Sequence, residues 1–214
     1  MNKNIIFIGP PASGKGTQAD LLAKKKGYVK ISPGIVLRKN VENETEIGKI
    51  IEPFLRSGNL VPTKIVNKIV IDRVNELKSG FVIDGFPREI EQAKALDSEL
   101  VKLEGENLVI NIELSDEEVM SRIHGRLSCS KCGASYHLDY KKPENDTLCD
   151  LCNQELVHRK DETKQAIANR LENYHKLTKP LKEYFQSNDN YKYFSIDGNQ
   201  PIEKVFSEIE NIIK

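Results

Sequence analysis

Residues 9–17, with the sequence GPPASGKGT, have the types and spacing of a loop that binds phosphate groups. They fit the motif G-x-x-x-x-G-K and lie between an apolar run at 4–9 and a helical pattern at 15–27. Glycine lets the backbone approach phosphate oxygens closely, and the N-terminus of the following helix offers free N–H groups. Lys15 would contact the β and γ phosphates of a nucleoside triphosphate. The alternative is an incidental glycine-rich turn, which the strand–loop–helix order disfavours.

One position of the loop departs from the motif. Gly16 stands where a serine or threonine usually follows the lysine, and Thr17 comes one residue later. The residues expected to contact the triphosphate are Ala12, Ser13, Gly14, Lys15, Gly16 and Thr17. The loop therefore predicts nucleoside triphosphate binding and leaves the reaction open.

The four cysteines of the chain form two Cys-x-x-Cys pairs in one polar insert. Cys129, Cys132, Cys149 and Cys152 have the spacing C-x2-C-x16-C-x2-C, which is typical of a four-thiolate zinc site. Four thiolates fill a tetrahedral shell, so the metal would be structural, and His137 is not expected to be a ligand. Iron instead of zinc, free thiols or disulfides, and a redox role are the alternatives. Two pairs in one small module favour a shared metal.

Length and charge describe an ordinary globular chain. Its 214 residues suit one core with insertions, and 32 Lys plus Arg balance 32 Asp plus Glu. This balance does not favour nucleic acid as a partner. The apolar run near the N-terminus is too short for a signal peptide or a membrane span, so we expect a cytoplasmic protein without a membrane partner.

Strands and helices are expected to alternate, which is typical of a parallel sheet covered by helices. The expected strands are 4–9, 28–32, 81–85, 107–114 and 191–197. The expected helices are 15–27, short pieces within 33–58, 62–80, 88–100, 115–127, 161–186 with a kink at Pro180, and 201–214. The sequence thus predicts an α/β fold in which a five-stranded sheet positions the phosphate loop.

Further motifs follow the order and spacing found in adenylate kinases. They are GPPASGKGTQ at 9–18, DGFPR at 84–88 with Gln92, RIHGR at 122–126, RKDE at 159–162, and Arg170. The chain resembles the long-lid form of that family over essentially its whole length, and a zinc-binding lid is a known variant of this form. The resemblance implies reversible phosphoryl transfer from ATP to AMP giving two ADP, in nucleotide homeostasis and purine salvage. It also implies Mg²⁺ with ATP, structural Zn²⁺ in the lid, and a monomer.

The resemblance implies three structural parts. A P-loop NTPase-type core would consist of 1–32, 62–121 and 160–214. A mobile helical segment at 33–61 would bind AMP, and a small zinc-binding lid would span 122–159. Both parts are expected to close over the nucleotides, because water must be excluded if ATP is not to be hydrolysed.

An arginine-rich site is the signature expected of this reaction, because an AMP phosphate is already an anionic nucleophile and needs no strong general base. By resemblance, Arg38 and Arg88 hold the AMP phosphate through bidentate guanidinium contacts. The arginines around the transferring phosphoryl group would be Arg122, Arg126, Arg159 and Arg170. Any one of them alone would more often be a solvated surface charge. Their place in the motifs favours function.

The resemblance also assigns groups that bind the metal and the bases. Asp84 would orient waters on Mg²⁺, with a plain turn residue as the alternative, and Gln92 would pair with the adenine of AMP through its amide. Further ATP contacts are expected from Arg126, Ser135, Tyr136 and Gln200. Further AMP contacts are expected from Pro33, Arg38, Asn59, Leu60, Val61, Gly85, Phe86, Pro87, Arg88, Arg159 and Arg170.

The acceptor region departs from the family pattern. The family has Ser-Thr-Gly-Asp-x-Leu-Arg where this chain has SPGIVLR at 32–38, so Pro33 replaces a threonine and Ile35 an aspartate. Loss of one hydrogen bond to the acceptor base would cost about 0.5–1.5 kcal/mol, which weakens the site without abolishing it. Ala12 is a milder departure, because a glycine is common at this position of the loop.

Three other functions stay open at this point. The chain could phosphorylate another nucleoside monophosphate or use GTP, although its long lid is unlike the UMP/CMP branch. It could be a phosphate-loop protein whose zinc ribbon binds nucleic acid, but the insert at 129–152 carries acids and no basic stripe with interleaved aromatic residues. It could also bind nucleotides without turnover, which the retained arginines disfavour.

Overall fold

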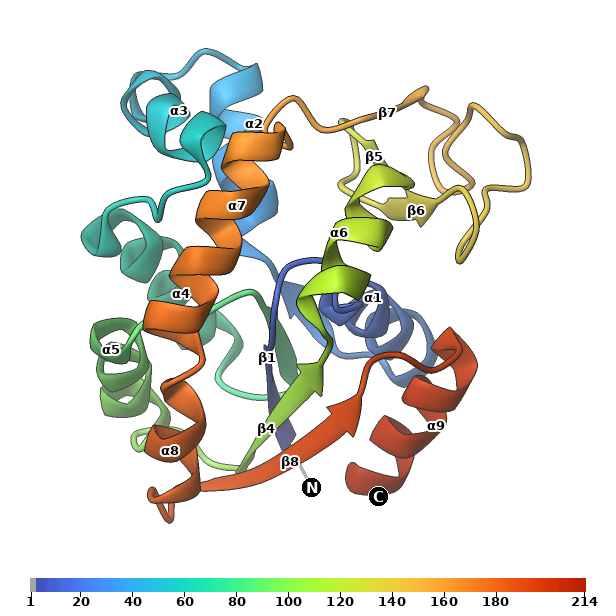
Figure 1. Ribbon diagram of the computed structural model, residues 1–214. Coiled ribbons are helices and arrows are strands. Elements are labelled where there is room, and N and C mark those ends of the chain that lie inside the picture. Colours follow the sequence, from blue (N-terminus) through green and yellow to red (C-terminus); the bar gives the residue numbers. More distant parts are fainter. Residues whose placement is uncertain (1–2) are drawn as a thin grey trace.

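The computed structural model describes residues 3–214 as a central parallel sheet with helices on both faces and a second, small sheet at one end (Figure 1). The central strands are β1 (Lys3–Ile8), β2 (Val29–Ile31), β3 (Phe81–Asp84), β4 (Glu106–Glu113) and β8 (Tyr191–Asp197). Their spatial order is β2-β3-β1-β4-β8, and each neighbouring pair is parallel. The five-stranded parallel sheet predicted from the sequence is confirmed.

The sheet is buried on both faces, as the unbroken apolar runs require. Ile5 and Phe7 of β1 pack on one face, and Ile6 and Ile8 on the other. The first face is covered by α1 (Lys15–Lys26) and α9 (Ile202–Ile212). The second is covered by α4 (Thr63–Leu77), α5 (Ile90–Leu100) and α8 (Leu181–Gln186). The core therefore forms two apolar layers that hold the strand ends fixed.

Two insertions lie beyond the carboxyl ends of the strands (Figure 1). The first contains α2 (Pro33–Glu42) and α3 (Glu46–Ser57). The second is the small antiparallel sheet of β5 (Arg126–Cys129), β6 (Ser135–His137) and β7 (Leu156–Val157). It is entered from α6 (Asp116–His124) and left towards α7 (Lys164–Asn173). Both insertions reach the end of the sheet where the phosphate loop lies.

Local sequence signals explain where the helices around these insertions begin and end. The hydroxyls of Ser115 and Thr163 accept hydrogen bonds from the backbone of the first turns of α6 and α7, at 3.3 and 3.2 Å. Gly27 and Gly58 end α1 and α3 in the left-handed conformation. No helix within 3–214 combines the length and apolar character needed to cross a membrane.

Two helix predictions were wrong in part. The helix expected over 115–127 ends at His124, because Arg126 and Leu127 pair with His137 and Tyr136 as the first strand of the small sheet. The helix expected over 161–186 begins at Lys164 and is interrupted before Pro180 rather than at it.

That interruption is η1 (Tyr174–Thr178), a π-helical turn between α7 and α8. The N–H of Lys179 donates to the carbonyl of Tyr174, five residues earlier, at 2.8 Å. Pro180 supplies no N–H to the helical ladder, and the wider turn accommodates this loss.

Candidate functional site

A single cleft at the carboxyl edge of the sheet brings together nearly all the residues predicted to bind nucleotides. From the predicted set it is lined by Ala12, Ser13, Gly14, Lys15, Gly16, Thr17, Pro33, Arg38, Asn59, Leu60, Val61, Asp84, Gly85, Pro87, Arg88, Gln92, Arg122, Arg126, Ser135, Tyr136, Arg159, Arg170 and Gln200. Phe86 lies elsewhere, since its side chain is fully buried in the apolar core beneath the cleft. The predicted contact of Phe86 with AMP stays a prediction, and the side chain of Phe86 does not line the cleft.

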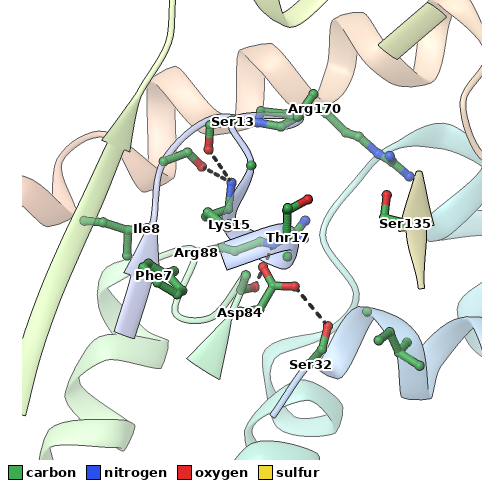
Figure 2. A pocket seen from close by; sticks show the side chains of 18 of the residues that line it. Phe7, Ile8, Ser13, Lys15, Thr17, Ser32, Asp84, Arg88, Ser135 and Arg170 are labelled. Carbon is green, nitrogen blue, oxygen red and sulfur yellow. Dashed lines mark hydrogen bonds between the residues drawn. The ribbon is translucent and has the colours of Figure 1, made fainter. Parts of the chain in front are cut away.

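The phosphate loop holds its lysine in a desolvated position. Lys15 Nζ donates to the carbonyls of Gly9 and Pro10 at 3.0 and 2.5 Å and to Ser13 Oγ at 3.1 Å (Figure 2). Burial lowers the pKa of Lys15 to about 7, and Arg88 acts in the same direction. A cation in such a place gains strongly from an anion beside it, because water does not screen the attraction.

The backbone of the loop shows why glycine is common at position 12. Ala12 has φ 57°, in the left-handed region, where a residue with a Cβ carries a cost of about 1–2 kcal/mol. Gly9 is more constrained, since a Cβ on it would lie 2.3 Å from the carbonyl oxygen of Ile112. The loop therefore accommodates an alanine at position 12, whereas position 9 has no room for a Cβ.

Three guanidinium groups converge on one carboxylate. Glu162 is held by Arg126 through a two-pronged contact, and its Oε1 lies 3.3 Å from Arg170 Nη1 and 3.6 Å from Arg159 Nη1. Its side chain is only 6% exposed. Asp161 adds a second pair with Arg170 at 2.5 Å. Arginines from β5, the last turn of α7 and the segment between are thereby fixed in one place.

Two further arginines face this cluster from the acceptor side. Burial and the nearby Arg170 lower the pKa of Arg88 to about 10, and Asp84 opposes the shift. Burial likewise lowers the pKa of Arg38, with Asp161 opposing the shift. Crowded, desolvated cations of this kind mark a site for a strongly anionic ligand.

Asp84 lies at the carboxyl end of β3, beside the phosphate loop (Figure 2). Its Oδ2 accepts a hydrogen bond from Ser32 Oγ at 3.4 Å and lies 3.9 Å from Lys30 Nζ. A Cβ on Gly16 would lie 3.2 Å from the same oxygen. The missing side chain at position 16 thus leaves room for this carboxylate to face the loop.

The donor side of the cleft is shaped by Arg122 and the lid. Arg122 Nε donates to Glu118 at 3.0 Å, and its Nη2 donates to the carbonyl of Gly198 at 2.9 Å. The guanidinium lies over the ring of Tyr140, 5.2 Å from its centroid. Arg122 therefore presents a fixed flat face to the cleft rather than a free charge.

The lid contributes chain segments whose side chains face inward. Tyr136 is 4% exposed, and its hydroxyl accepts a hydrogen bond from Asp150 N–H at 2.9 Å. His137 is also buried, and its Nδ1 accepts from the N–H groups of Asp139 and Tyr140. Tyr136 can therefore offer a nucleotide its backbone and not its phenol.

The four cysteines meet in the core of the lid. Their Sγ atoms all lie within 4.8 Å of one another, with Cys129–Cys152 at 3.4 Å and Cys132–Cys149 at 3.5 Å. Thiolates on a tetrahedral metal at bond lengths of about 2.3 Å lie about 3.8 Å apart, so the cluster has the size of such a site. Apart from these thiols, few apolar side chains are buried in the lid: Leu127, Ala134, Tyr136 and Leu156.

Gln92 lines the cleft, and its side-chain amide is engaged in hydrogen bonds within the protein. Its Oε1 accepts from Arg88 N–H at 2.9 Å, and its Nε2 donates to Glu89 Oε1 at 3.2 Å. The side chain is 2% exposed. In this structure the amide holds the backbone of an arginine.

Several cleft residues were missed by the sequence predictions. They include Lys30, His137, Tyr140, Lys141, Asn173, Tyr174 and Thr178. The predictions also missed Asp161 and Glu162, which do not line the cleft but pair with its arginines. The two acids stand within the RKDE motif, so a search for counter-ions to the arginines could have found them. Tyr174 and Thr178 reach the cleft from the π turn, for which the sequence gives no signal.

Comparison with known proteins gives a consistent result. A sequence model of the family described as adenylate kinase matches residues 7–190. An adenylate kinase of Clostridium tetani is 41% identical over 213 residues, covering 98% of each chain. One from Caldicellulosiruptor bescii is 45% identical over 187 residues, or 86% of each chain, and one from Methanosarcina acetivorans is 41% identical over 213 residues, or 98% of each. This chain therefore belongs to the adenylate kinase family, the phosphotransferases that act between ATP and AMP.

Proposed function

We propose that this chain transfers the γ-phosphoryl group of ATP to AMP, reversibly, within the cleft described above. The observation that carries the proposal is the convergence of guanidinium groups in one cleft beside the phosphate loop. They come from segments far apart in the sequence, including α2, the loop after β3, β5 and α7. Such an arrangement suits a reaction in which positioning and charge neutralisation supply most of the catalysis.

Different residues of the cleft bind the phosphates of the two nucleotides. The loop at 9–17 holds the triphosphate of ATP, and Lys15 binds its β and γ phosphates. Arg38 and Arg88 hold the phosphate of AMP. An oxygen of that phosphate attacks the γ phosphorus, and a new P–O bond forms while the bond from the γ phosphorus to the β–γ bridging oxygen breaks. ADP leaves on one side, and a second ADP is formed on the other.

The remaining arginines stabilise the charge that is shared during transfer. Arg126, Arg159 and Arg170 face the space between the two phosphate sites, and Glu162 keeps them together before a nucleotide arrives. Fixed charges of this kind need no reorganisation at the moment of reaction, which is the main source of electrostatic catalysis.

Mg²⁺ fits the carboxylate at the end of β3. Asp84 faces the loop across Gly16, and its neighbours Ser32 and Lys30 hold the side chain in place. We assign Asp84 to orient waters on the ion. When bound with ATP, the ion neutralises charge on the β and γ phosphates.

We further propose that 33–61 and 122–159 act as two flaps on the core formed by 1–32, 62–121 and 160–214. The lid touches the acceptor flap where Gly133 meets Ile35, since a Cβ on Gly133 would lie 2.8 Å from Ile35 Cδ1. Such closure excludes water from the γ phosphate. Both nucleotide sites are built from one chain, so a monomer suffices.

We assign the four thiolates to a structural Zn²⁺. The lid has too small an apolar core to fold unaided, and a metal clamp supplies the missing stability. Four protein ligands leave no position for an activated water, so the ion takes no part in the chemistry. Iron would fit the same ligand set, and metal analysis by mass spectrometry distinguishes the two.

The Cys149→Ser variant is expected to contain much less than one zinc per chain. Its Tm should fall by about 5–10 °C. This fall corresponds to a loss of about 2.5 kcal/mol in the free energy of unfolding, at about 2–4 °C per kcal/mol in a chain of this size. Zinc content and Tm are measured on the purified protein, with the exposed Lys131→Ala as a control in the same turn. Full zinc content in the cysteine variant would show that the ligand set is wrong.

A coupled assay of ADP formation tests the reaction itself. With ATP and Mg²⁺ we expect turnover with AMP and much slower turnover with UMP, CMP and GMP. Pro33 and Ile35 line or border the acceptor side of the cleft, so the ranking of the four acceptors also reports how these substitutions affect the base. Absence of transfer to every monophosphate refutes the proposed function.

A further inference from the structure

The peptide unit of Arg88 is held from both ends by buried side chains. Its N–H donates to Gln92 Oε1 at 2.9 Å, and its carbonyl accepts from Thr178 Oγ1 at 2.8 Å. The guanidinium is fixed in turn, since Arg88 Nε donates to the carbonyl of Gly85 at 3.0 Å. Few degrees of freedom remain for this arginine at the edge of the acceptor site.

Both clamping side chains are buried, and Gln92 is held by a further hydrogen bond. Gln92 Nε2 donates to Glu89 Oε1, the carboxylate that also accepts from Thr63. Gln92 is 2% exposed and Thr178 is 8% exposed, so neither hydrogen bond competes with bulk water.

Thr178 reaches Arg88 because it ends the π turn η1. A π turn adds a residue to the helical repeat and rotates the side chains that follow it, and such turns are frequent at functional sites. The same helical stretch is tied to the acceptor flap, because Asn169 and Asn173 donate to the carbonyls of Ser57 and Gly58 at 2.7 and 3.3 Å. The stretch from α7 to η1 thus contacts both the end of α3 and the peptide of Arg88.

We propose that Thr178 is a positioning residue for the acceptor phosphate, because its hydroxyl fixes the carbonyl of Arg88 and thereby the place of the guanidinium. The inference rests on the proposed function, in which Arg88 binds AMP. It explains why a helix that is otherwise continuous towards α8 accepts the poorer geometry of a π turn. Thr178 does not touch the nucleotide in this scheme and acts through Arg88 alone.

Replacement of Thr178 by valine keeps the shape and removes the hydroxyl. We expect the KM for AMP to rise about three- to tenfold, the range that corresponds to one lost neutral hydrogen bond. The KM for ATP should change less than twofold, because the phosphate loop is not touched by this side chain. Thr178→Ser restores the hydroxyl and should bring the KM for AMP back towards the wild-type value.

A matched control separates this effect from the loss of any hydroxyl. Ser98 donates to the carbonyl of Ala95 at 2.8 Å on the exposed side of α5, and Ser98→Ala should leave both KM values unchanged. The affinity for AMP, measured by calorimetry, and the Tm are recorded for each variant. A wild-type KM for AMP in Thr178→Val overturns the inference, as does an equal rise in both KM values that serine does not reverse. Absence of wild-type turnover with AMP refutes the proposed function instead.

Discussion

The Lys15→Ala variant is expected to lose kcat by about 10²- to 10³-fold while it keeps its fold. The lysine is half-buried in the phosphate loop and donates to two carbonyls and a hydroxyl, so its charge sits where the proposed function places the β and γ phosphates. Removal of one preorganised donor to a developing charge typically costs about 10²- to 10³-fold in rate. Steady-state kinetics with saturating ATP and AMP measures the loss.

Folding is checked by circular dichroism and by Tm, since alanine is a good helix former at the first position of α1. The control is Lys24→Ala, which removes an exposed lysine from the last turn of the same helix and should leave kcat unchanged. Near-normal turnover in Lys15→Ala would falsify the assignment of the loop to phosphate binding.

Glu162→Gln is expected to reduce kcat by about 10- to 100-fold without weakening the binding of nucleotides. The carboxylate is the common partner of Arg126, Arg159 and Arg170. Removal of one partner from a buried charge cluster strongly destabilises it, because the remaining charges are left uncompensated. The arginines then repel one another and must be gathered by the substrate. At the same time the cleft becomes more positive, which favours anionic ligands in the ground state.

The two effects are measured separately, by kcat and by calorimetric titration with ATP. The Tm of the free variant should fall, and nucleotide should recover part of the loss, because the phosphates replace the missing negative charge. Glu172→Gln is the control, since that carboxylate lies in α7 and forms an exposed pair with Lys176. A parallel fall in affinity and kcat contradicts the proposed role of Glu162.

The central sheet and the phosphate loop could be predicted because each depends on local pattern. The apolar run of β1 buries both faces, and the glycines of 9–17 fit only a close turn into a helix. The cysteine cluster follows from spacing alone. These features need no knowledge of distant contacts.

Features that depend on tertiary contacts were not predicted, or were predicted in the wrong element. Arg126 has helical neighbours in sequence, yet pairing with His137 places it in a strand. The π turn results from the meeting of α7, Pro180 and the peptide of Arg88. The side chain of Phe86 fills the core although its neighbours Gly85 and Pro87 line the cleft, and no local rule separates the three.

The contact between Gly133 and Ile35 joins the cysteine cluster to the helical insertion that carries Arg38. Gly133 follows Cys132 directly and donates to the carbonyl of Cys129 at 2.9 Å, so its place is set by the turn that carries the first cysteine pair. Its bare backbone, at φ 78°, is the surface against which the isoleucine of the opposite flap rests. If the cysteines hold a metal as proposed, that metal helps to place the surface on which Ile35 rests, through a contact of hydrocarbon against peptide that dissolved salt does not screen.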